Sequence, residues 1–122
     1  MRNRISRRAA MRRVVVGALA GEALVAAAAT PDFTIVAPGN KAVLTSPVLL
    51  RMSVVDAEIG LPRDGRYHLH FSVDGGEEVA VYHVRDYSLK LSPGMHVIAV
   101  EIAGPSHRAL GPPKRVAFMV RE

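Results

Sequence analysis

The sequence predicts an all-β protein, an immunoglobulin-like sandwich of two antiparallel sheets with about seven strands, preceded by a helical signal segment. Two observations predict this class. After residue 30, no window of about a dozen residues shows the three-and-four apolar spacing of a helix, whereas several short windows alternate with period two. Turn-forming combinations of Gly, Pro, Asn and Asp separate these windows. Many short strands with frequent turns are typical of immunoglobulin-type sandwiches.

The first 29 residues show the three zones of a secretory signal. Residues 1–13 are rich in Arg, residues 14–29 are apolar, and Ala27, Ala28 and Ala29 provide the small side chains that signal peptidase accepts. The apolar zone contains Glu22 and is shorter than the roughly 20 residues that a membrane span needs. We therefore expect a cleaved signal peptide over residues 1–29 and one domain over residues 30–122, with no membrane span after cleavage.

The leader predicts a secreted or periplasmic protein. Export by the general secretory route is favoured over the twin-arginine route, because Ala9 and Ala10 follow Arg7-Arg8 where twin-arginine signals usually have bulkier apolar residues. Met1 and Met11 both remain possible starts, since the segment from Met11 is a conventional leader by itself. The chain has no Cys, so the domain is expected to be held by its core without disulfides.

The net charge of +5 comes from the leader. Six Arg and one Glu lie in residues 1–29, whereas the remaining residues hold ten basic and ten acidic side chains. A nucleic-acid-binding domain keeps its basic residues on the folded surface, where they contact phosphates. Nucleic acid is therefore not expected as a partner.

The first three expected strands precede a long loop. A Pro-Gly-Asn turn at residues 38–40 ends the first strand, and Pro47 precedes the third. The third strand carries apolar residues on both sides, so both of its faces are expected to be at least half buried. Residues 58–65 contain Gly, Pro and Asp-Gly and are expected to form the loop. The three strands are expected over residues 33–36, 42–44 and 48–55.

Later strands include one that carries two histidines. In the stretch 67–73, apolar residues occupy the odd positions, while His68 and His70 occupy even positions. Asp74-Gly75-Gly76 then supplies residues that accept the positive backbone angles of a tight reversal. Gly and Pro within residues 104–113 indicate a second long loop. The later strands are expected over residues 67–73, 79–84, 87–91, 95–103 and 115–121.

Three spaced motifs carry a resemblance to known domains. They are His68-x-His70-x-x-x-Asp74-Gly75, then Pro93-Gly94-x-His96, then His107-x-x-Leu110-x-Pro112-Pro113 before an alternating last strand. Their order resembles a family of uncharacterised bacterial secreted domains with an immunoglobulin-like fold. Residues 91–100 are also similar to the corner before the penultimate strand of fibronectin type III domains, with His96 where those carry Tyr. The resemblance implies an exported sandwich and no particular reaction.

The histidines are the candidate site. Residues i and i+2 of a strand project from one face about 6.6 Å apart, so His68 and His70 can converge on one metal ion. Imidazole suits Zn and Cu, and a thioether ligand favours Cu(I). The alternatives are that both are ordinary polar residues on the solvent face of a strand, or that they belong to a surface that binds a protein or another ligand. The candidates for a third ligand are His107, His96, Met119 and Glu101.

His96 has a structural alternative. Its position on the apolar side of its strand predicts a place at the rim of the core, with the ring hydrogen-bonded to backbone near residues 91–94. A ring buried in that way is expected to be neutral, because desolvation disfavours the charged form. His107 is expected on a loop at one end of the sandwich, where binding residues often lie, and His83 at a solvated edge.

Motifs of catalysis are absent from the sequence. It has no Gly-rich phosphate loop, no Cys nucleophile and no Gly-x-Ser-x-Gly elbow. The leading hypothesis is therefore a non-enzymatic exported binding or accessory module, whose partner is an unknown protein or small ligand of the cell envelope. The alternative is a periplasmic protein that binds Cu or Zn through His68 and His70 with His107 or His96. No other cofactor is expected.

Overall fold

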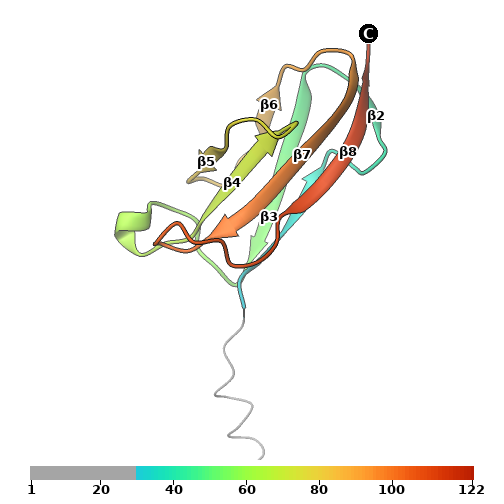
Figure 1. The fold of residues 1–122 in the computed structure, drawn as a ribbon. Helices are drawn as coiled ribbons and strands as arrows, with labels where there is room; N and C mark the ends of the chain where they lie inside the picture. The colour runs from blue at the N-terminus through green and yellow to red at the C-terminus, as the bar shows by residue number, and fades with distance from the viewer. Residues whose placement is uncertain (1–29) are drawn as a thin grey trace, which may run out of the picture. The chain divides into compact units, whose positions relative to one another are not determined.

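The computed structural model describes residues 30–122 (Figure 1). Its eight strands form two sheets, and one short 3-10 helix lies between the third and fourth strands in the chain. The expected signal peptide lies outside the described residues. Among residues 30–122, no helix has the length and apolarity needed to cross a membrane. The elements are β1 (Asp32–Ala37), β2 (Val43–Thr45), β3 (Val48–Val55), η1 (Pro62–Asp64), β4 (His68–Val73), β5 (Val79–Val81), β6 (Tyr87–Leu89), β7 (Gly94–Ala103) and β8 (Lys114–Arg121).

The two sheets confirm the predicted immunoglobulin-like sandwich. One sheet has the order β1-β3-β6 and the other the order β2-β8-β7-β4-β5. The strand pairs are antiparallel except β2 with β8, which run parallel, and this pair corrects the expectation of purely antiparallel sheets. The chain leaves the first sheet after β1 and joins the edge of the second, where Lys41 N–H donates to the Ala117 carbonyl.

Alternating apolar side chains fill the space between the sheets. Leu50, Leu69, Ile98 and Phe118 are completely buried there. The odd positions of β4 face this core, as the period of two predicts. The expectation that both faces of β3 are half buried is wrong, because Leu49 and the other residues of its second side are exposed. In the described residues, no layer covers that side of the three-stranded sheet.

A tight turn joins β4 to β5. Asp74 and Gly75 have positive φ angles of 54° and 74°, and Gly76 N–H donates to the Val73 carbonyl at 2.9 Å. Positive φ at both central residues is the requirement of a type I′ turn, which matches the twist of the strands it joins. β5 is shorter than expected and ends at Val81, because the chain then leaves this sheet for β6 in the other.

Gly94 at the start of β7 has a φ of 129°, a backbone conformation that L residues rarely adopt. A Cβ added there meets no atom within 4 Å, so a side chain costs backbone strain alone. We expect Gly94→Ala to lower the free energy of unfolding by about 1 kcal/mol. Urea denaturation measures this loss against Gly111→Ala, whose added Cβ also meets open space and which lacks a positive φ. Equal stability of the two variants would contradict the strain.

Candidate metal centre

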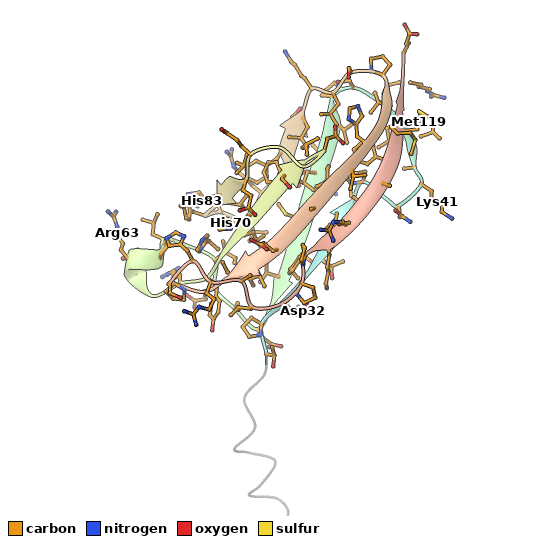
Figure 2. All side chains as sticks on the ribbon, in the orientation of Figure 1. Asp32, Lys41, Arg63, His70, His83 and Met119 are labelled. Atoms are coloured by element: carbon orange, nitrogen blue, oxygen red, sulfur yellow. The ribbon has the colours of Figure 1, made fainter. Side chains whose placement is uncertain are left out.

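Two histidines of β4 lie on the outer face of the five-stranded sheet. His68 pairs with Ala103 of β7, and His70 lies between Glu101 of β7 and Ala80 of β5. Leu69 and Phe71, which alternate with them on β4, face the core. Figure 2 shows His70 beside β4. The i, i+2 spacing therefore places both imidazoles on one side of the sheet, as the sequence predicts.

A turn in the loop between β7 and β8 brings the third histidine to this face. His107 N–H donates to the Gly104 carbonyl at 2.9 Å, and Gly104 N–H donates to the Arg108 carbonyl at 3.1 Å. His107 has a φ of 66° and so occupies the left-handed position that glycine usually takes in such turns. A non-glycine residue in this conformation is uncommon. The conformation directs the imidazole of His107 towards the two histidines of β4.

The three imidazoles are in ring contact, with His68 in the middle. The ring centroid of His68 lies 4.7 Å from that of His70 and 4.6 Å from that of His107. One ring nitrogen from each of the three residues lies within 4.8 Å of the others. Tetrahedral ligands at about 2.0–2.1 Å from a Zn ion are about 3.4 Å apart. A closure of at most about 1.4 Å, which side-chain rotation can supply, brings the nitrogens to this separation.

His68 is completely buried, although it lies on the outer face of its sheet. The interpretation as an ordinary polar residue on a solvent face is therefore wrong for His68. The rings of His107 and Tyr82 lie against it, with centroid distances of 4.6 and 5.6 Å. Within residues 30–122, neither ring nitrogen of His68 has a hydrogen-bond partner, and Nδ1 of His70 also has none.

Burial lowers the pKa of His68, and positive charge on His70 or His107 lowers it further. Desolvation disfavours the imidazolium form, so the ring stays neutral over a wider range of pH than a free histidine. Neutral imidazole is the form that binds metal ions. The local environment therefore holds His68 in the ligand-competent state.

Two carboxylates adjoin the cluster on its β7 side. Oε1 of Glu101 lies 3.5 Å from Nδ1 of His70, and a ligand atom of Glu78 lies within 4.8 Å of both residues. A cavity of about 140 Å³ is lined by these three side chains together with Ser72 and Arg115. Glu101 is among the ligand candidates of the sequence. Glu78 and Tyr82 are not among those candidates. The register of β4 with β5, which brings the flanks of β5 beside the histidines, is the signal that could have identified them.

His96 is not part of the cluster, and its assignment as a metal ligand is wrong. It pairs with Phe118 near the start of β7, and its ring belongs to the opposite face from His68. Nδ1 lies 2.6 Å from Oδ2 of Asp74, and Nε2 lies 2.6 Å from the Ser92 carbonyl oxygen. Both neighbours are acceptors, so both ring nitrogens donate and neither has a free lone pair.

The expected corner hydrogen bond of His96 is confirmed by Ser92, but the expected neutral ring is wrong. The hydrogen bond to Asp74, together with the bond to Ser92, raises the pKa of His96 despite its burial. The same contact with His96 and the Val97 N–H lower the pKa of the Asp74 carboxyl. The imidazolium of His96 and the carboxylate of Asp74 therefore stabilise each other as an ion pair.

Met119 lies far from the cluster. It pairs with Met95, eight positions along β7 from Ala103, which corresponds to about 27 Å at the rise of a strand. Figure 2 shows Met119 and His70 well apart. Its thioether therefore provides no ligand here. His83 is exposed in the loop after β5 and belongs to neither group of ligand residues.

No family model matches the sequence, and no curated protein is significantly similar to it. Fibronectin(III)-like modules of CbhA from Clostridium thermocellum share the fold, with a TM-score of 0.57 and 20% identity over 74% of this chain and 97% of theirs. SGBP-B from the mixed-linkage glucan utilization locus of Bacteroides ovatus aligns with a TM-score of 0.49 and 15% identity, over 74% of this chain and 24% of its own. The first likeness establishes the fold.

Proposed function

We propose that this protein is a non-enzymatic, exported binding domain that holds one Zn²⁺ or Cu²⁺ ion through His68, His70 and His107. One observation carries the proposal. A completely buried imidazole without a hydrogen-bond partner lies in ring contact with two other imidazoles. A buried polar group left unpaired destabilises a protein by about 1–3 kcal/mol. A metal ion bound to a ring nitrogen of His68 would supply the missing partner and offset this destabilisation.

The donor set selects the class of ion. Imidazole nitrogens suit Zn²⁺ and Cu²⁺, while soft sulfur ligands are needed to favour Cu(I). The chain has no Cys, and Met119 is remote from the three rings. The carboxylate of Glu101 beside the cluster offsets part of the positive charge of a bound divalent ion. The site therefore suits Zn²⁺ and Cu²⁺ better than Cu(I).

The architecture of the site favours reversible binding. Two ligands come from the rigid strand β4, whereas His107 comes from a loop and is exposed. A three-ligand site with one exposed member leaves a coordination position for water or an exchange partner. The Arg-rich and apolar zones of residues 1–29 support export, so the ion would be taken from the envelope or the medium.

Titration of the purified, metal-stripped protein with Zn²⁺ and Cu²⁺ in a calorimeter tests the proposal. We expect one ion per chain. His107→Ala should weaken binding by more than the roughly 10- to 100-fold that loss of an outer partner costs. His107 is exposed on a loop, so this variant should keep the fold, which circular dichroism checks.

The matched control is His83→Ala, which removes an exposed loop histidine outside the cluster. It should bind like the unaltered protein. Identical isotherms for His107→Ala, His70→Ala and His83→Ala would overturn the assignment. So would the lack of any binding tighter than that of an unstructured histidine peptide.

A further inference from the structure

We propose that Glu101 is a positioning residue for the metal centre, which accepts the Nδ1–H of His70 and leaves Nε2 as the ligand atom. The inference rests on the proposed function and adds to it. Histidine ligands of protein-bound metals almost always donate their second ring N–H to an outer acceptor, commonly a carboxylate. That acceptor fixes which nitrogen carries the proton and how the ring is oriented.

Sheet register brings the two side chains together. His70 and Glu101 are direct partners in the β4–β7 pair, so both project from the same outer face. The side chains are 15% and 23% exposed, and Nδ1 of His70 is buried. The contact is therefore fixed by two rigid strands and does not depend on a flexible loop.

The contact is one small rotation short of a hydrogen bond. Nδ1 of His70 lies 3.5 Å from Oε1 of Glu101, at the outer limit for such a bond. Within the described residues, Nδ1 has no other partner. Rotation about the last side-chain torsions brings the two atoms to the usual 2.7–2.9 Å of a charge-assisted bond, which is strengthened by partial burial.

The chemistry of imidazole then assigns the ligand atom. A neutral ring has one donor nitrogen and one acceptor nitrogen. With the proton on Nδ1 and held by Glu101, Nε2 carries the free lone pair. The carboxylate also offsets charge from the ion. Glu78 lies near the same histidine but is exposed, which makes it the matched comparison.

Two measurements on Glu101→Ala, Glu101→Gln and Glu78→Gln test this role. Calorimetry should show Zn²⁺ affinity lowered about 10- to 100-fold in Glu101→Ala, a smaller loss in Glu101→Gln, whose amide oxygen still accepts, and little change in Glu78→Gln. Long-range ¹⁵N–¹H correlation NMR of the metal-free protein reads the tautomer. His70 should carry its proton on Nδ1 in the unaltered protein and lose this preference in Glu101→Ala.

The outcomes separate the two proposals. If the unaltered protein binds no metal, the proposed function fails, and the tautomer measurement alone decides whether Glu101 holds His70. If it binds metal and Glu101→Ala retains both the affinity and the tautomer, only the positioning role fails. A second ion per chain that disappears in Glu101→Gln would make Glu101 a direct ligand and would also overturn this role.

Discussion

Replacement of His68 by Leu is expected to stabilise the metal-free protein by about 1–3 kcal/mol and to remove metal binding. Most substitutions of a completely buried residue destabilise a fold. His68 is an exception because its two ring nitrogens are buried without partners within residues 30–122. Leucine fills a similar volume and brings no polar group that needs a partner. The gain is the desolvation penalty that the imidazole incurs.

Urea unfolding in the presence of a chelator measures this gain. The control is His83→Leu, an exposed loop position where a change within about 0.5 kcal/mol is expected. Excess Zn²⁺ should reverse the order of stability. At a free concentration about 1,000 times the dissociation constant, the ion adds about 4.1 kcal/mol to the unaltered protein and nothing to His68→Leu. A less stable His68→Leu protein under chelator would show that the ring is already satisfied.

The same substitution should change the response to acid. The pKa of His68 is lower in the folded state than in the unfolded state, chiefly because of burial. Below about pH 6.5, the unfolded chain therefore binds a proton at this site that the folded chain does not. The free energy of unfolding falls as the pH decreases through this range. His68→Leu should lose that part of the acid sensitivity.

Strand periodicity predicted the fold more completely than the site. Alternation placed Leu69 in the core and His68 on the outer face, because the direction of a side chain on a strand depends only on the parity of its position. Whether that outer face meets water depends on the loop after β7. The loop covers His68 because His107 adopts a left-handed conformation. No periodicity encodes this conformation.

The charge state of His96 could not be predicted from the local sequence pattern either. Its place at the corner followed from its strand and from the neighbouring Pro-Gly. Its protonation depends on Asp74, which lies 22 residues away in sequence and comes close only through the register of β4 with β7. Desolvation alone predicts a neutral ring. A carboxylate at 2.6 Å outweighs that effect and reverses the direction of the pKa shift.

The Asp74–His96 ion pair should stabilise the fold in a defined window of pH. The pKa of His96 is raised above 6.5 in the folded state, so its contribution is complete below about pH 6.5 and is lost as the pH rises through the folded value. The pKa of Asp74 is lowered below 3.8, so its contribution is present above about pH 4 and is lost as the pH falls through the folded value. The contribution is therefore greatest between about pH 4 and pH 6.5.

Asp74→Asn tests the pair without disturbing the turn. Asparagine tolerates the positive φ of this position, and its side-chain oxygen still accepts the Val97 N–H. The charge is removed together with the hydrogen bond from Nδ1 of His96, because an amide NH2 group replaces the acceptor Oδ2. Because Asp74 is partly exposed, we expect a loss of about 1–2 kcal/mol at pH 5.5, at the low end for a hydrogen bond between charged groups. The loss should shrink as the pH rises and His96 becomes neutral.

Asp56→Asn is the matched control, because Asp56 also has a positive φ, is exposed, and has no recorded contact with a histidine among the described residues. Urea unfolding of both variants from pH 4.5 to pH 9 gives the comparison. A loss for Asp74→Asn that is constant over this range would mean that His96 does not change charge there. An equal loss in Asp56→Asn would instead assign the effect to the turn conformation, since the two variants share the backbone geometry and differ in the imidazolium partner.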